Sequence, residues 1–255
     1  MSTTAPKPLR LGILVPSSNT ALEPLTYALV ASIPNTTVHF SRFPVTEIAL
    51  SSKALAQFDD SHIVSAAKLL ADAHVDIIGW SGTSAGWLGL EADRKLCARI
   101  EEVTGVRATT SVLGLFGILK RALPGKERPY GLVTPYLDAV QVRVVKTMAE
   151  EGFPVAAESH LNRQVNVKFA DIDEETLDWQ MAEVMKGLPR EGVKVVSTFC
   201  TNLKAAHRAA HWEEQYPGLV VADTVSTVVL EMLRVVGSET PAIEGWGKIF
   251  GLLSQ

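Results

Sequence analysis

The 255-residue chain is poor in cysteine: it has only two, too few for a disulfide framework, so we expect a reduced, cytoplasmic setting. It also lacks an excess of positive charge, because 24 Lys and Arg face 28 Asp and Glu, and the cations form no stripe that could hold a phosphate backbone. No apolar run approaches the roughly 18 residues of a membrane span, and the polar N-terminus has no apolar core of a signal peptide. We therefore expect neither nucleic acid nor a membrane as a partner.

Signals for cofactors and metals are also missing. The glycines of GTSAGWLG (82–89) fit neither the Walker nor the dinucleotide-binding spacing, so no nucleotide or other cofactor is expected. His207 and His211 lie one helical turn apart, a spacing compatible with a metal. The motif lacks the glutamate that follows the first histidine in zinc peptidases, and its pattern is typical of a surface helix. The sequence therefore predicts no metal site.

What the chain does have is a regular alternation of short and long apolar patterns. Hydrophobic residues make up 47% and charged residues 20%, a balance typical of a globular protein. Short β-branched runs alternate with stretches of helical period such as 91–105 and 138–152, which predicts parallel sheets covered by helices. The expected strands are 9–15, 36–43, 75–80, 106–111, 128–134, 154–160, 193–199 and 218–223.

The two halves of the chain resemble each other. Three segments recur in the same order, with offsets of 119, 118 and 114 residues. Such a duplication predicts an α/β fold of two similar Rossmann-like lobes, related by a pseudo-two-fold axis, with the active site in the cleft between them. We place the N-terminal lobe at 1–125, with 226–255 packing back on it, and the C-terminal lobe at 126–225. The matching segments are LGILVPSSN (11–19) with YGLVTPYLD (130–138), VDIIGWSGTS (75–84) with VKVVSTFCTN (193–202), and RATTSV (107–112) with VADTVS (221–226).

Small polar residues follow four of the predicted strands, at positions that we call strand tips. Ligands of open parallel sheets bind beyond the carboxyl ends of the strands, so we expect the tips to line the cleft. Two tips precede helical patterns, and amides at helix N-termini bind carboxylates and lower the pKa of a thiol. Ordinary helix capping would give the same residue types at a single tip, but four similar tips favour a site. The tips are PSSN (16–19), GTS (82–84), TPY (134–136) and FCTN (199–202).

The two cysteines occupy different settings. Cys200 lies at a strand tip, and its counterpart in the first half is Gly82, so it has no thiol opposite it. Cys97 takes an apolar position of a helical pattern and is expected in the core. Tyr136 occupies the tip position that matches Ser17, which favours a hydroxyl donor in the cleft over a purely structural aromatic residue.

The tips resemble motifs of the aspartate/glutamate racemase superfamily, within the branch of maleate cis-trans isomerases and arylmalonate decarboxylases. VPSSNTALEP (15–24) resembles the isomerases' N-terminal signature, and TPY resembles the shared tyrosine motif. VNVKFADI (165–172) is similar to the isomerase stretch that carries a substrate-binding asparagine, here Asn166. GTS (82–84) resembles the decarboxylases instead. The similarity extends over nearly the whole chain.

The resemblance implies a cofactor-independent enzyme that forms a carbanion or enediolate at the α-carbon of a small carboxylic acid. It also implies a homo-oligomer. Apolar contributors to the cleft are expected at Phe43, Pro44 and Trp87. By the same resemblance, Cys200 is the catalytic residue, Gly82, Thr83, Ser84, Tyr136 and Thr201 bind carboxylate oxygens, and Pro16, Ser17, Asn19, Asn166 and Asn202 bind the substrate.

Departures from both enzymes leave three alternatives. The isomerases and racemases typically use two cysteines, whereas this chain has one at a tip, and Thr201 stands where the decarboxylase has glycine. The first prediction is a decarboxylase of a substituted malonate, with Cys200 as the proton donor. The second is a maleate cis-trans isomerase or a racemase of the Asp, Glu or hydantoin type, in which Gly82 leaves room that another enzyme fills with its second thiol. The third is a small-acid binding protein without chemistry.

Overall fold

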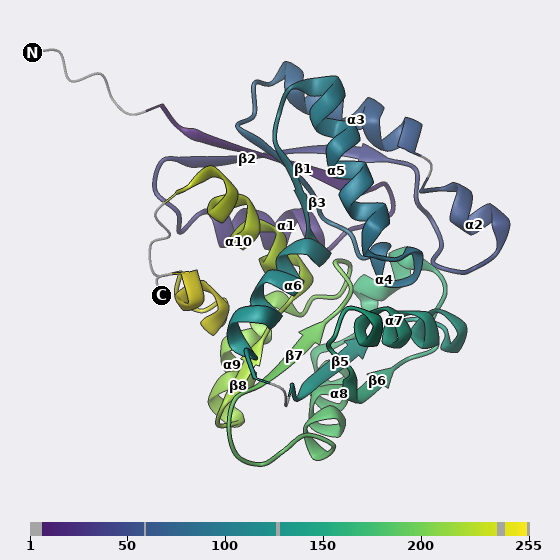
Figure 1. Ribbon diagram of the computed structural model, residues 1–255, viewed down its shortest axis with the longest axis vertical. Helices are drawn as coiled ribbons and strands as arrows, with labels where there is room; N and C mark the ends of the chain where they lie inside the picture. The colour runs from purple at the N-terminus through teal and green to yellow at the C-terminus, as the bar shows by residue number, and fades with distance from the viewer. Residues whose placement is uncertain (1–6, 59, 126–127, 239–242, 254–255) are drawn as a thin grey trace, which may run out of the picture.

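The computed structural model describes residues 7–58, 60–125, 128–238 and 243–253, and its framework is a pair of four-stranded parallel sheets (Figure 1). The strand orders are β2-β1-β3-β4 and β6-β5-β7-β8, which are the same order once the halves are matched. All the predicted strands are confirmed, each within two residues at either end. Their bounds are β1 Leu9–Pro16, β2 Thr36–Phe43, β3 Ile77–Trp80, β4 Ala108–Thr110, β5 Tyr130–Thr134, β6 Val155–His160, β7 Lys194–Thr198 and β8 Leu219–Val221.

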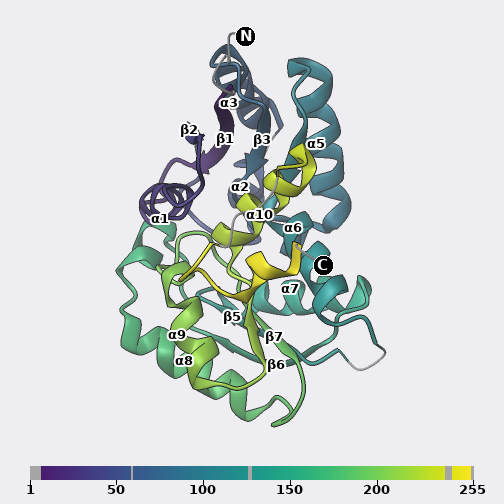
Figure 2. The same ribbon diagram turned by 90° about the vertical axis from the view of Figure 1, so that its left-hand side faces the viewer.

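Helices cover the sheets, and the two lobes lie one above the other in the second view (Figure 2). The predicted helices 91–105 and 138–152 correspond to α5 and α7. The α-helices are α1 Leu22–Val30, α2 Ser52–Ala56, α3 Asp60–Asp72, α4 Ala85–Leu88, α5 Leu90–Thr104, α6 Ser111–Ala122, α7 Asp138–Glu150, α8 Glu174–Lys186, α9 Ala209–Gln215 and α10 Thr224–Val236. Three 3₁₀ helices are η1 Asn166–Asp171, η2 Ala206–Arg208 and η3 Lys248–Leu253.

The register of the strands repeats between the sheets and corrects one alignment. The central strand pairs confirm the predicted offsets of 119 and 118 residues. The third offset is 113 rather than 114, because Thr110 and Asp223 both occupy the N-cap of the following helix and cap it with their side chains. The equivalent Cα partners are Leu14 with Trp80 and Val133 with Thr198, then Ile78 with Ala108 and Val196 with Val221.

Helices α6 and α10 pack together between the lobes. A Cβ at Gly114 of α6 would overlap the carbonyl oxygen of Thr227 on α10, so only glycine permits this approach of the two backbones. Side chains of α10 also pack over Gly79 of β3, while Phe116 of α6 contacts Phe153 of the second half at a ring distance of 5.8 Å. Each helix therefore contacts the opposite half of the chain. The lobe boundaries at 125 and 225 stay a prediction.

The described segments contain no helix that is both long enough and apolar enough to cross a membrane. The predicted cytoplasmic setting and the predicted homo-oligomer stay predictions.

Candidate active site

A small cavity lies between the two lobes, with a volume of about 20 Å³. A space of this size holds about one water molecule, so this form of the protein has no room in the cavity for a larger ligand. Its wall combines the tips of β1, β3, β5 and β7 with side chains from residues 44–58, the segment that follows β2. The lining residues are Pro16, Val45, Ile48, Phe58, Trp80, Gly82, Thr83, Ser84, Trp87, Tyr136, Asn166, Cys200 and Thr201.

Eight of the eleven predicted site residues line this cavity. Parallel strands bring their carboxyl ends to one edge of each sheet, and the pairing of the lobes brings the two edges together. Ser17, Asn19 and Asn202 lie outside the wall. The eight are Pro16, Gly82, Thr83, Ser84, Tyr136, Asn166, Cys200 and Thr201.

A line of hydroxyl and thiol groups crosses the cavity from one lobe to the other. The Thr83 Oγ1 and Tyr136 Oη atoms are 2.6 Å apart, and the Tyr136 hydroxyl is close enough to Cys200 to lower the pKa of its thiol. Burial raises the pKa of the Tyr136 phenol well above its ordinary value, so Tyr136 keeps its proton and remains a donor. Ser84 stands at the N-cap position of α4 but makes no capping bond. Ordinary capping therefore does not explain Thr83 and Ser84.

Cys200 is a buried, protonated thiol. Its side chain is 4% exposed, and burial raises the pKa of the Cys200 thiol to about 12. The backbone amides of Asn202 and Leu203 and the Tyr136 hydroxyl oppose this shift, because each stabilises the thiolate. The negative charge of Asp223 acts in the same direction as burial. These amide and hydroxyl donors would hold a thiolate once the proton has left.

The helix expected directly after Cys200 does not begin there. Residues 201–205 form turns, and the first helical turn is η2 at Ala206. The predicted lowering of the thiol pKa by a helix N-terminus is therefore wrong, and burial dominates instead. The backbone amides that stabilise the Cys200 thiolate, those of Asn202 and Leu203, belong to this turn.

Asp223 is a neighbour of this thiol that the sequence analysis missed. It is 1% exposed, accepts a hydrogen bond from Thr198 Oγ1 and caps α10. Burial raises the pKa of Asp223 to about 6, while the Thr198 hydroxyl and two backbone amides hold it below the value that burial alone would give. A polar residue between a strand and a helix is also a common cap, so the sequence offered no separate signal for it.

The space opposite Cys200 in the duplicated half is filled by an indole. A Cβ placed on Gly82 would overlap the ring of Trp80, which itself packs on Phe43 with ring centroids 5.0 Å apart. The prediction that Gly82 leaves room is therefore wrong, because Trp80 occupies that room. Of the expected apolar contributors, Trp87 lines the cavity, Phe43 lies behind Trp80, and Pro44 is exposed.

Two asparagines at the tips join the lobes instead of facing the cavity. Asn19 Oδ1 accepts from the backbone amides of Ala21 and Leu22, at the start of α1, at 3.1 and 2.9 Å. Its Nδ2 donates to Thr201 Oγ1 at 3.2 Å, and that hydroxyl donates to the carbonyl of Ser81 at 3.3 Å. The Thr201 hydroxyl is thus committed to a contact between the lobes.

We expect Asn202→Ala to lower the stability of the protein by about 2–4 kcal/mol, because buried backbone groups lose their partners. Asn202 Oδ1 accepts from the amides of Thr20 and Ala21 at 2.9 and 3.1 Å, and its Nδ2 donates to the carbonyl of Asn166 at 2.6 Å. Urea unfolding measures the change, with Thr20→Ala, at an exposed neighbouring side chain, as the control. Equal midpoints for the two variants would contradict this role of Asn202.

The segment 44–58 closes the cavity from the side of the first lobe. Ser17 Oγ accepts from the amide of Val45 at 3.1 Å, and the amide of Ile48 donates to the carbonyl of Gln164 in the second half at 3.1 Å. The amide of Asn166 donates to the carbonyl of Thr46 at 3.3 Å. These bonds place the Val45 and Ile48 side chains, which the sequence analysis missed, in the cavity wall.

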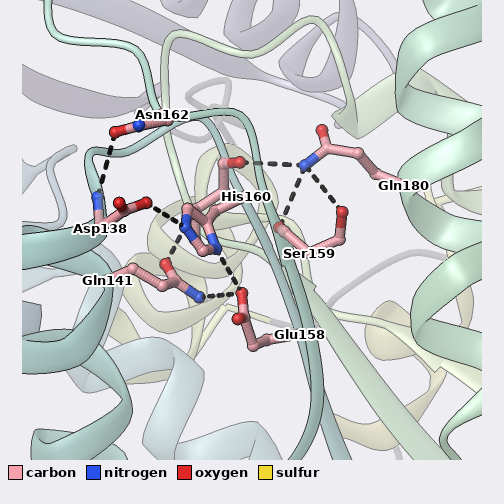
Figure 3. A network of polar contacts seen from close by, with 8 residues as sticks. Asp138, Gln141, Glu158, Ser159, His160, Asn162 and Gln180 are labelled. Atoms are coloured by element: carbon pink, nitrogen blue, oxygen red, sulfur yellow. Dashed lines mark hydrogen bonds and ion pairs between the residues drawn. The ribbon is translucent and has the colours of Figure 1, made fainter.

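A polar network fixes the tip that carries Tyr136 (Figure 3). His160 lies between Asp138 at 2.8 Å and Glu158 at 2.9 Å. Gln141 Nε2 donates to Glu158 at 2.7 Å, and its Oε1 accepts from Thr134 Oγ1 at 2.7 Å, two residues before Tyr136. Burial lowers the pKa of His160, but the two carboxylates outweigh burial and raise it. The network holds β5, β6 and α7 in register at the site.

The remaining candidates lie outside the cavity. Cys97 is buried in α5, where burial and nearby carboxylates raise the pKa of its thiol. His207 Nε2 contacts Glu174 at 3.0 Å on the surface. Across the described part of the chain, no three His, Cys, Asp or Glu residues gather in a group that could hold a metal ion.

The two matched sheets and the thiol between their tips define the class as the two-lobed α/β enzymes of the aspartate/glutamate racemase superfamily. Within that class, residues 11–250 match the family model described as arylmalonate decarboxylase. The chain therefore belongs to the arylmalonate decarboxylase family, and the predicted resemblance is confirmed.

Several solved structures share this fold. The maleate isomerase Iso from Pseudomonas putida S16 has a TM-score of 0.83 and 24% identity, covering 96% of this chain and 98% of that chain. The Nocardia farcinica maleate cis-trans isomerase bound to TRIS has a TM-score of 0.82 and 21% identity, covering 96% and 99%. A liganded double mutant of arylmalonate decarboxylase has a TM-score of 0.80 and 19% identity, covering 96% and 99%. The comparison with curated proteins gives no match.

Proposed function

We propose that the protein is a cofactor-independent decarboxylase of a substituted malonate, with Cys200 as the proton donor. The observation that carries the proposal is the indole of Trp80 at Gly82. A two-thiol enzyme would need a second acid near this position, whereas an indole N–H is a hydrogen-bond donor only. Cys97, the other thiol of the chain, lies in α5 outside the cavity. One face of the substrate therefore meets an acid, which suits a reaction that adds a single proton.

The retained carboxylate would bind at the hydroxyls of Thr83, Ser84 and Tyr136. All three line the cavity, and each has a side chain that is at most 6% exposed. Loss of CO2 leaves an enediolate, and hydroxyl donors fixed in a water-poor site stabilise the charge that develops on its oxygens. Among the described residues that line the cavity there is no Lys, Arg or His, so neutral donors would carry this stabilisation.

The departing carboxylate would face the apolar part of the wall. Val45, Ile48 and Phe58 supply that part, and none of their side chains can donate a hydrogen bond to a carboxylate. An unsolvated carboxylate is less stable than one in water, and its charge leaves the group as neutral CO2 forms. The site would therefore favour breaking of this bond over binding of the intact dianion.

The proton steps balance without a cofactor. The bond between the α-carbon and the departing carboxylate breaks, and its electron pair passes into the enediolate. The α-carbon then takes the proton of the Cys200 thiol, and the resulting thiolate is held by the amides of Asn202 and Leu203 and by the Tyr136 hydroxyl. Water returns a proton to the thiolate before the next turnover. Because the proton comes from one face, a stereogenic product would be a single enantiomer.

A maleate cis-trans isomerase is the second candidate, and Asn166 is the observation that favours it. This residue lines the cavity, is 4% exposed and donates from Nδ2 to Ser18 Oγ at 2.8 Å, so a buried amide is in place for a second carboxylate. The Nocardia farcinica isomerase has been solved with a covalently bound succinylcysteine intermediate. A comparable route here would start from a Cys200 thiolate.

The pH dependence of kcat/KM separates these two routes. Burial raises the pKa of Cys200 to about 12, so the thiol is protonated at every pH below that value. A thiol acid therefore gives a flat profile with a malonate from about pH 7 to about pH 9. A thiolate nucleophile gives a rising profile instead, because kcat/KM increases about tenfold per pH unit below the pKa of Cys200. Activity recovered on return to pH 7 checks that the protein stayed folded.

Proton NMR in deuterated buffer tests the reaction itself. The panel contains methyl-, phenyl- and alkenyl-malonates, maleate, and single enantiomers of aspartate, glutamate and a hydantoin. Loss of CO2 with one deuteron in the product supports the decarboxylase. Fumarate formed from maleate, or deuterium entering an α-carbon without loss of carbon, overturns it in favour of an isomerase or racemase. Stabilisation by malonates without turnover would indicate a binding protein.

A further inference from the structure

Two tryptophans in the cavity wall have indole N–H groups that the protein itself leaves without an acceptor. Trp80 is 1% exposed and Trp87 is 7% exposed, and both line the cavity. Within the part of the chain that the structure describes, the Nε1 atoms of both are buried and have no hydrogen-bond partner. Buried indole N–H groups usually have one, so two such groups in the wall of one small cavity need an explanation.

Among the described residues, neither indole N–H makes a hydrogen bond to a neighbouring side chain. The Cε2 and Cζ2 atoms of Trp80 lie nearest to a Cβ built on Gly82, and Cε2 carries Nε1, so this N–H lies beside Gly82 in the wall. The Trp87 ring packs edge-on to Tyr136 and Phe58, at centroid distances of 5.5 and 5.8 Å. An acceptor on the molecule that occupies the cavity would satisfy both groups.

The carboxylates of a malonate are unsuitable partners for these two groups. The retained carboxylate has the hydroxyls of Thr83, Ser84 and Tyr136. A hydrogen bond from an indole to the departing carboxylate would stabilise the ground state and slow the loss of CO2. The remaining part of a substituted malonate is the substituent on the α-carbon. A substituent with an oxygen atom would satisfy the indoles without hindering the reaction.

We infer that Trp80 and Trp87 determine specificity by donating hydrogen bonds to an oxygen acceptor on the α-substituent of the substrate. The inference rests on the proposed function and adds a substrate class to it: malonates with a compact hydroxyl, alkoxy or acyl oxygen on the α-carbon. A site with buried donors discriminates strongly against an analogue that lacks the acceptor, because the donors then stay unpaired in the complex. The small cavity, with the Trp80 ring over Gly82, favours a compact group over an aryl ring.

Methoxymalonate and ethylmalonate test this inference, because their substituents match in size and differ by one oxygen atom. Ratios of kcat/KM for the two acids are compared between the unmodified protein and the variants Trp80→Phe and Trp87→Phe. Comparing variants removes the intrinsic difference in reactivity between the acids. We expect each variant to lower the methoxy-to-ethyl ratio at least fivefold, whatever its effect on the two separate rates. Trp179→Phe, at a tryptophan that is 54% exposed on α8, is the matched control and keeps the ratio.

A ratio that stays unchanged in both cavity variants overturns the inference. Indole N–H signals in ¹⁵N-edited NMR give a direct readout in the unmodified protein, which has five tryptophans. The Trp80 and Trp87 signals, assigned from the variants, should move downfield with methoxymalonate and stay in place with ethylmalonate. Equal responses of all five indole signals to the two acids also overturn it, and this outcome needs no assignment if a variant fails to fold.

Failure of the proposed function is distinguishable from failure of the inference. If neither acid loses CO2, the decarboxylase proposal fails. The role of the two indoles is then tested by measuring the affinity of the protein for each acid by calorimetry. Tighter binding of methoxymalonate that Trp80→Phe or Trp87→Phe abolishes supports the role of the indoles. Equal binding of the two acids, or a preference that both variants keep, contradicts it.

Discussion

We expect Cys200→Ala to slow the proposed decarboxylation by about a thousandfold, since a positioned general acid contributes roughly 10²–10⁴-fold to such a reaction. The fold should survive, because alanine leaves the hydrogen bond between Thr83 and Tyr136 and the contacts between the lobes in place. Burial holds the Cys200 thiol protonated at neutral pH, so the variant loses the proton donor itself. The measurement is the rate of CO2 release, with the deuterium content of the product read by NMR.

Two further variants decide whether the thiol proton is responsible. Cys200→Ser keeps the shape and a hydroxyl but supplies a much weaker acid, so we expect it to resemble Cys200→Ala. Cys97→Ala removes the other thiol, which is buried in α5 outside the cavity, and we expect activity within about twofold of the unmodified protein. An active Cys200→Ala protein with single-enantiomer product would remove Cys200 from the proton-donor role.

The fold and the position of the cavity followed from local patterns in the sequence. Strands that alternate with helices and recur at a fixed offset leave few arrangements open, and parallel strands place their tips at one edge. This is why residues as distant in sequence as Thr83 and Tyr136 were expected together, and they lie in hydrogen-bonding contact. Local patterns are sufficient where the backbone alone decides which residues meet.

Features that depend on side-chain volume or on the packing of the two lobes were not predicted. Trp80 fills the space at Gly82, although residues two apart in a strand point to the same face, and that spacing was an available signal. Val45 and Ile48 come from a segment held by backbone bonds to residues 164–166 of the other half, and no local pattern indicates this. The turn after Cys200 was predicted to be a helix. The helical pattern begins only near Ala206, and the prediction extended it back to the end of β7.

The Trp80 indole predicts the behaviour of a second thiol at position 82. Gly82→Cys alone should lower the stability by about 1–3 kcal/mol and cost most of the activity, because its Cβ overlaps a ring that is buried and packed on Phe43. Trp80→Val, tested alone, should lose stability as a large-to-small change in the wall. The double variant should be more stable than the sum of the two single losses, by at least about 1 kcal/mol, since removing the ring admits the cysteine.

The double variant should also change the stereochemical outcome of the reaction. With the ring removed, a thiol at position 82 can reach the cavity and supply a proton to the face of the α-carbon opposite Cys200. The substrate for this test is a malonate with two different α-substituents, because only then is the α-carbon of the product stereogenic. We expect racemic product from the double variant and single-enantiomer product from the unmodified protein and from Trp80→Val, as measured by chiral chromatography. Strictly additive stabilities with unchanged enantiomeric excess would mean that the indole is not what keeps the reaction to one face.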